Sequence, residues 1–201
     1  SMKVVFSLSH RGLQGMLLDY HGASKTFIEK QRGTANSYHV HKGSTNRGGK
    51  SFECHTSDLG LAQAGVAAPQ LFDDQILRKF RIAISASGSY SDHHGGGVAD
   101  ALAAINATLT RINEVFETDL GVTLELIPNN DLVIFTDAAT DPYTGNLNAQ
   151  VQSTLSSLIG EENYDVGILF NDDNDNGNAG FIGSVCIDNR KGSAFASALE
   201  P

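Results

Sequence analysis

Residues 98–120 read VADALAAINATLTRINEVFETDL, and this stretch decides the fold of the larger part of the chain. Its larger apolar side chains recur at spacings of three and four residues, and Gly121 follows as a C-terminal stop. The recurring residues are Val98, Leu102, Ile105, Leu109, Ile112, Phe116 and Leu120. Because this spacing places them on one face of an α-helix, we expect a long helix with that face buried.

Short apolar segments around this helix predict the strands of a sheet. These segments are residues 80–85, 122–127, 132–135 and 166–170. Residues 147–159 predict a second amphipathic helix, while the Ser-, Gly- and His-rich residues 87–97 predict a break. The order strand, helix, strand, strand, helix, strand predicts an α/β sandwich with a mostly parallel sheet.

The first part of the chain has a different pattern. Five short β-type runs alternate with Gly-, Ser- and Asn-containing turns, which predicts a small antiparallel sheet. The runs are Val4 to Leu8, Gly15 to Tyr20, Thr26 to Glu29, Ser37 to His41 and Ser51 to Cys54. Residues 56–75 have the composition of an exposed connector. We therefore expect a β-rich region with its connector at 1–76 and an α/β domain at 77–201.

The composition disfavours two kinds of partner. With 23 acidic residues against 14 basic ones, the net charge of -9 repels nucleic acid. No apolar run approaches the roughly 20 residues that cross a bilayer, so no membrane span is expected. The absence of Trp, the 21 glycines and the many turn residues are typical of an extracellular domain. Ser1-Met2 looks like an expression remnant, and it is compatible with the removal of a native export signal.

Several segments of the α/β part resemble one protein family. They are Arg81 to Tyr90, His94 to Gly96, Ala101 to Ile105, Asn129 to Leu132, Thr140 to Tyr143 and Tyr164 to Gly167. In this order they resemble bacterial secreted metallopeptidases of the reprolysin type, within the metzincins. The resemblance implies a metzincin-like N-terminal subdomain. Its twisted, mostly parallel sheet would carry two helices and an antiparallel edge strand.

The zinc ligands of that family are missing from the sequence. The resemblance implies a helix with His-Glu-x-x-His-x-x-Gly-x-x-His, in which three imidazoles hold zinc and the Glu is the general base. The seven histidines stand at 10, 21, 39, 41, 55, 93 and 94, and no two have the i, i+4 spacing. Because the chain ends at Pro201 before such a helix would begin, we expect an inactive fragment of a secreted zinc endopeptidase. We assign no catalytic residue.

The stretch 177–186 resembles the part of the family that binds substrate. It begins with Gly177, Asn178, Ala179 and Gly180 and ends at Cys186. In the family this stretch forms an edge strand, whose unpaired backbone groups can add a substrate peptide as a further strand. We expect a strand around Phe181 to Val185, antiparallel and with one side uncovered. The alternative is a glycine-rich surface loop.

The resemblance makes residues 1–76 the end of a propeptide. Propeptides of some zinc proteases inhibit by placing a cysteine thiolate on the metal. Cys54, within Phe52-Glu53-Cys54-His55, is the candidate for such a thiolate, and the alternative is a simple buried thiol. In the family Cys186 usually pairs with a later cysteine, so the resemblance implies that it is unpaired here.

Two further groups of residues suggest metal sites. Asp172, Asn174 and Asn176, followed by Gly177, match the opening of a calcium loop. The twelfth position is Gly183 instead of Glu, which excludes the helix-loop-helix form and leaves a looser calcium site or a solvated turn. His39 and His41 alternate in a predicted strand, so both face the same side; the alternative to a metal pair is that they face solvent.

Two functions follow from these patterns. The first is a fragment of a secreted zinc endopeptidase, whose partners would be peptide or protein substrates. The second is a non-catalytic extracellular module that binds calcium or a peptide with a protease-like fold. An incomplete domain would leave apolar surface open. We expect that surface to be covered by the N-terminal region, by another copy of the chain in a homo-oligomer, or by the missing C-terminal half.

Overall fold

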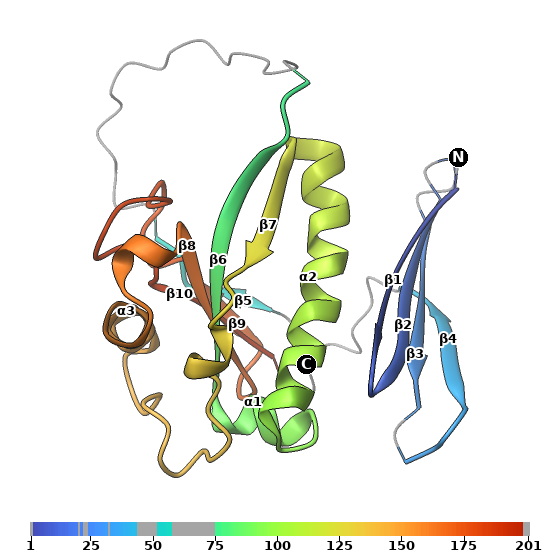
Figure 1. The fold of residues 1–201 in the computed structure, drawn as a ribbon, viewed down its shortest axis with the longest axis horizontal. Coiled ribbons are helices and arrows are strands. Elements are labelled where there is room, and N and C mark those ends of the chain that lie inside the picture. Colours follow the sequence, from blue (N-terminus) through green and yellow to red (C-terminus); the bar gives the residue numbers. More distant parts are fainter. Residues whose placement is uncertain are drawn as a thin grey trace.

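Two β-sheets flank one long helix in the computed structural model (Figure 1), which describes residues 2–19, 21, 24–31, 33–43, 52–57 and 75–198. The first sheet is antiparallel, with the order β1-β2-β3-β4. Its strands are β1 (Met2–Ser9), β2 (Gly12–Asp19), β3 (Ser24–Lys30) and β4 (Tyr38–Lys42). The first four predicted strands are therefore confirmed, with small shifts at their ends.

The second sheet has six strands in the order β5-β9-β10-β8-β6-β7. All neighbouring pairs are parallel except β9 with β10, which confirms a mostly parallel sheet with an antiparallel strand near one edge. The strands are β5 (Glu53–Cys54), β6 (Arg78–Ala86), β7 (Val122–Leu126), β8 (Val166–Asn171), β9 (Asn176–Asn178) and β10 (Ala194–Ser197). The short β10 was not predicted, because Ala-Phe-Ala-Ser gives little strand signal.

The two predicted helices cover opposite faces of the second sheet. Helix α2 (Val98–Leu120) ends at Gly121 in the left-handed conformation, with φ of 61°, as the sequence predicted. Its buried face packs on Ile82 and Ile84 of β6. Helix α3 (Leu147–Leu158) packs on the other face, where Ala83 lies. Adjacent residues of β6 thus pack against different helices, because successive side chains in a strand point to opposite faces of the sheet.

Two local predictions are wrong. The expected break at 87–97 contains a short helix, α1 (Gly88–His93), whose N-cap Ser87 accepts a hydrogen bond from the backbone N–H of Tyr90. The expected strand at 132–135 is instead the 3₁₀ helix η1 (Asn130–Val133), followed by a single bridge to Ala86. The buried side chain of Asn130 bonds to both the N–H and the carbonyl of Ile84, each at 2.8 Å. This amide satisfies the backbone of β6 where a neighbouring strand would have done so.

The fifth predicted strand also differs from expectation, because β5 leaves the N-terminal sheet and pairs with β9 in the second sheet. Residues 58–74 of the predicted connector lie outside the described residues. None of the helices in the described ranges is long and apolar enough to cross a membrane.

The N-terminal sheet packs against α2 from the side opposite the second sheet (Figure 1). Met16 and Leu18 of β2 are buried. Ion pairs join the two parts, with Lys3 Nζ 2.7 Å from the buried Glu114 and Arg111 Nη2 3.0 Å from Glu29. This contact brings the N-terminal sheet and the α/β part together around α2.

Candidate functional site

Strand β9 lies between two strands of very different origin. On one side it pairs antiparallel with β10, where Gly177 is opposite Ala196. On the other side it pairs in parallel with β5, where Gly177 is opposite Cys54. The Glu53 N–H donates to the Asp175 carbonyl at 2.9 Å, and the His55 N–H donates to the Gly177 carbonyl at 2.8 Å. The chain's own N-terminal region therefore occupies the outer side of β9.

Two details of the predicted edge strand are wrong. The strand covers Asn176–Asn178 and not residues 181–185, which form turns. Its outer side, expected to be open, is taken by β5. The turns have a clear backbone cause, because Gly180, Gly183 and Cys186 all have positive φ, between 63° and 74°, which an extended strand does not allow.

The structure places three of the four predicted peptide-binding residues, Gly177, Asn178 and Ala179, along the segment 52–56. Gly177 lets the Phe52 ring lie close to β9, since a Cβ at residue 177 would be 2.8 Å from Cζ of Phe52 and 3.1 Å from the Phe195 carbonyl. The Asn178 side-chain amide donates to the His55 carbonyl at 3.0 Å. The Ala179 N–H donates to Oγ1 of Thr56 at 2.8 Å. Gly180 has φ of 71°, and a Cβ there would overlap Ser193.

The register of β5 decides which face of the sheet its side chains occupy. Cys54 is opposite Gly177, which is opposite Ala196, so these three residues point to the same face. Phe52 and Ala196 both line the hollow beside α2, which identifies that face. Cys54 therefore points to the face of the sheet that carries α2.

The Cys54 thiol is exposed and unpaired, so the alternative of a buried thiol is wrong. Hydrogen bonds from the backbone and the side chain of Thr56 hold the pKa of this thiol below its ordinary value. A lower pKa increases the thiolate fraction, and the thiolate is the form that binds metals and attacks electrophiles. Cys186 is also exposed and unpaired, so the two cysteines form no disulfide with each other.

A hollow of about 590 Å³ lies beside α2, between the N-terminal sheet and strands β8 and β10. Tyr90 and Phe170 form part of its apolar lining, and its charged lining consists of Arg11, Lys30 and the ion pair of Arg111 with Glu29. The sheet face next to α2 is thus only partly covered by the N-terminal sheet.

The residues predicted to bind calcium make different contacts in the structure. Asp172 lies 3.3 Å from Nδ1 of His93, while Asn176 belongs to β9 and its N–H donates to the Asn174 carbonyl. The calcium site stays a prediction. On β4, the rings of His39 and His41 lie 5.6 Å apart, and His41 stacks on Phe27, so this pair also stays a prediction.

The residues present do not fit a catalytic zinc ion. The sequence has no His-Glu-x-x-His, and across the described ranges no group of three or more His, Cys, Asp or Glu side chains could hold a metal. Cys54 is a single candidate ligand, whereas a catalytic zinc site needs three protein ligands. The ligands and the general base of a zinc peptidase would have to come from outside this sequence.

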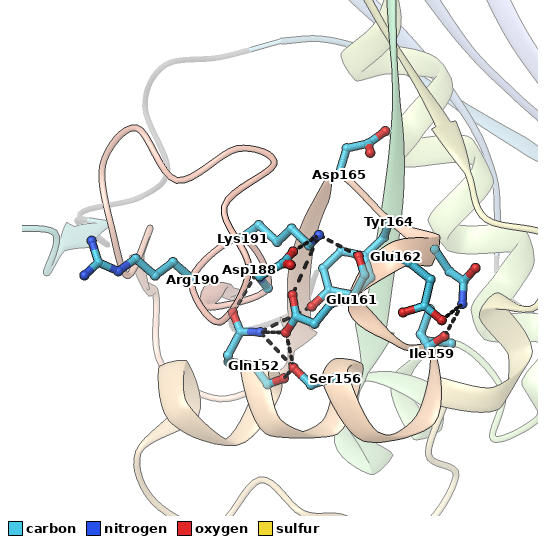
Figure 2. A network of polar contacts seen from close by, with 12 residues as sticks. Gln152, Ser156, Ile159, Glu161, Glu162, Tyr164, Asp165, Asp188, Arg190 and Lys191 are labelled. Carbon is cyan, nitrogen blue, oxygen red and sulfur yellow. Dashed lines mark hydrogen bonds and ion pairs between the residues drawn. The ribbon is translucent and has the colours of Figure 1, made fainter.

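A buried polar network fixes the loop that joins β9 to β10 (Figure 2). Lys191, only 6% exposed, donates to the Glu161 carbonyl at 2.5 Å and to Oδ1 of Asp188 at 2.6 Å. Glu161 in turn accepts from Gln152 at 2.8 Å and from Ser156 of α3. Through these contacts the loop is tied to α3, which holds β9 in place beside β10.

The same network encloses Tyr164, whose ring lies 5.0 Å from the Lys191 ammonium. Burial, together with the charge of Glu161, raises the pKa of Tyr164 to about 12. Sequence reasoning missed Glu161 and Lys191, because isolated charged residues in a turn are typical of solvated surface. Only the folded chain shows that they meet.

The second sheet and its two covering helices form an α/β domain with a mostly parallel sheet and one antiparallel strand, the fold that the family resemblance implied. The comparisons agree with this class of protein. Residues 77–201 match the family model described as metallo-peptidase family M12B, reprolysin-like. Because the match covers more than half of the chain, the chain belongs to this family of zinc-dependent metallopeptidases. A search of curated proteins found no match.

Proposed function

We propose that this chain comprises the proregion and the substrate-binding half of a secreted zinc endopeptidase, and that the 201 residues are inactive by themselves. The observation that supports this most directly is the pairing of β5 with β9. An exposed strand edge that accepts an extended segment is a common way for proteins to bind peptides. Here the segment 52–56 takes the position at which a substrate peptide would bind.

In this proposal the N-terminal region acts as an internal inhibitor. Its backbone N–H groups already donate to the carbonyl oxygens of Asp175 and Gly177. A substrate peptide therefore cannot pair with these carbonyls until the segment leaves. The Cys54 thiol points to the same face as the hollow beside α2. We propose Cys54 as the thiolate that this region offers to a zinc ion held by ligands from outside these residues.

The test is an activity measurement on two polypeptides. The 201-residue chain should cleave no protein or peptide substrate, with or without added zinc. A longer polypeptide that adds the His-Glu-x-x-His segment of the parent should cleave after removal of the N-terminal region, and a chelator should abolish the cleavage. Chelator-sensitive cleavage by the 201-residue chain alone would refute the proposal.

A second candidate is a non-catalytic extracellular module that binds peptide or calcium. The lack of a zinc-ligand set in the sequence favours it. Calcium titration separates the two parts of this candidate, because a site at Asp172, Asn174 and Asn176 would raise the melting temperature of the wild type and not of an Asp172→Asn variant. If calcium does not change the melting temperature of the wild type, the calcium-binding form of this candidate is wrong and only the peptide-binding form remains.

A further inference from the structure

The outer surface of α3 carries no charge. Residues 142–160, which include the whole helix, contain no Asp, Glu, Lys, Arg or His, although 18% of the chain is charged. The exposed positions of the helix are Ala149, Ser153, Ser157 and Leu158, and the two serines lie one turn apart; Asn148, Gln150 and Gln152 are partly exposed. Such a surface offers both donors and acceptors, and a ligand that binds there desolvates no ion.

A groove of about 550 Å³ lies between this helix and the loop that joins β9 to β10. Ser153 and Ser157 line the helix side, and Phe181 and Asn189 line the loop side. Among the described residues, none that lines this groove is charged. Its volume is within the range of about 300 to 1,000 Å³ that is typical of small-ligand sites.

The groove has polar groups that the fold does not use. The side chains of Ser153, Ser157 and Asn189 make no hydrogen bond to any other part of the chain that the structure describes. The Phe181 ring is 42% exposed, and the Arg190 guanidinium, 5.0 Å from its centroid, supports it from one side. Free hydroxyl and amide groups thus lie beside an exposed aromatic ring.

Both walls of the groove are held in place before any ligand binds. Gln152 of α3 accepts from the Gly192 N–H at 2.8 Å, and Asn148 donates to the Ser193 carbonyl at 2.5 Å. Figure 2 shows the Glu161 and Lys191 network between α3 and this loop, with the Arg190 side chain directed away from the network. A groove that is already formed loses little conformational entropy on binding.

We propose that this groove binds a neutral oligosaccharide. Sugar hydroxyls both donate and accept, as do the free serines and the Asn189 amide. The C–H face of a sugar ring would pack on Phe181, which offers a large apolar surface. The groove lies on the α3 side of the sheet, whereas Cys54 points to the α2 side, so the proposal does not depend on peptidase function.

The test uses the full 201-residue chain, labelled with ¹⁵N and titrated with three neutral hexasaccharides. These are the β-1,4-linked glucose, the β-1,4-linked N-acetylglucosamine and the α-1,4-linked glucose oligomers. At least one should shift amide signals of residues 146–157 and 181–193 and leave those of 53–56 unchanged. If none shifts the groove signals at millimolar concentration, the proposal is wrong.

Two matched variants make the result specific. Phe181→Ala should weaken sugar binding by about tenfold, equivalent to about 1.4 kcal/mol. Ile182→Ala removes the neighbouring exposed apolar side chain, 49% exposed and outside the groove lining, and should bind as the wild type does. Ser153→Glu should also weaken binding, because it places a charge in the groove. Equal binding by the wild type and Phe181→Ala, or preferential binding of an unstructured peptide in the groove, would overturn the proposal.

Discussion

Cys54 lies directly opposite Gly177 in the parallel pair of β5 and β9, although 122 residues separate them in the chain. This pairing brings the N-terminal region onto the strand that the family resemblance assigns to substrate binding. It also sets the direction of the Cys54 thiol, because register partners in a sheet point to the same face. The first two predictions below test this pairing, and the other two test ion pairs elsewhere in the α/β part.

Gly177→Ala should loosen the segment 52–56. The new Cβ would lie 2.8 Å from Cζ of Phe52 and 3.1 Å from the Phe195 carbonyl, so the Phe52 ring must shift and the packing of the segment on β9 is weakened. Hydrogen exchange of the His55 amide, which bonds to Gly177, should become faster, and the Cys54 thiol should react faster with a thiol reagent. Gly145→Ala is the matched control, because its Cβ meets nothing closer than 4.0 Å. Unchanged His55 exchange in Gly177→Ala would contradict the observed pairing.

Thr56→Val should raise the pKa of Cys54. The Thr56 hydroxyl helps to lower that pKa, and valine removes the hydroxyl with little change in shape. Since the thiolate is the reactive form, the rate of alkylation plotted against pH should move to higher pH. The backbone bond from residue 56 remains, so the shift should be partial. Thr56→Ser keeps the hydroxyl and should keep the wild-type curve; a similar shift in both variants would exclude the hydroxyl as the cause.

Asp165→Asn should reduce stability at neutral pH and not in strong acid. Arg81 donates to Asp165 from Nε at 3.2 Å and from Nη2 at 2.7 Å, and its side-chain hydrogen bonds hold the pKa of Asp165 below its ordinary value. A carboxyl group with a lowered folded-state pKa stabilises the fold above its unfolded pKa. That contribution disappears as the pH falls through the folded value.

Denaturation of the wild type and Asp165→Asn across pH 2 to 7 measures this difference. We expect the free energy of unfolding of Asp165→Asn to be lower than that of the wild type by about 1 kcal/mol at pH 7, and this difference to decrease towards zero in acid. Glu125→Gln removes a carboxylate that is 58% exposed and pairs with Lys79, and it should change stability by less than about 0.5 kcal/mol. A constant difference for Asp165→Asn at every pH would show that its charge is not the cause.

Lys191→Met should destabilise the loop between β9 and β10. It leaves Glu161 without its buried cation, and Oε2 of Glu161 already has no hydrogen-bond partner. We expect the free energy of unfolding to fall by about 3 kcal/mol, as is typical when one member of a buried ion pair is removed. Urea denaturation measures this loss. The double variant Lys191→Met with Glu161→Gln should recover part of this loss, because the only carboxylate left without Lys191 is that of Asp188, which is 65% exposed. Lys79→Met at an exposed pair is the control, and an equal effect there would rule out burial as the reason.

Local patterns predicted much of the α/β part correctly. The helix at 98–120 was found with both ends in place, because its apolar spacing and Gly121 act within a few turns of the chain. The first four N-terminal strands were found for the same reason. The η1 turn was not predicted, because the hydrogen bond between Asn130 and Ile84 joins residues 46 apart in the chain and leaves no local signal in the sequence.

For the candidate site, the sequence supplied the residues but not their partners. Residues 177–180 were identified through a resemblance, and Cys54 through its residue type. That β5 leaves its own sheet and lies along β9 depends on backbone hydrogen bonds between distant segments, which any extended segment can form.

The sequence by itself determined the two long helices, most strands and the absence of a His-Glu-x-x-His zinc helix, since periodicity and residue spacing are properties of neighbouring residues. Only the tertiary structure decided which strand occupies β9, which face Cys54 points to, and how Lys191 is enclosed with Glu161. Those outcomes depend on strand register and on burial, and both arise when segments far apart in the chain pack together.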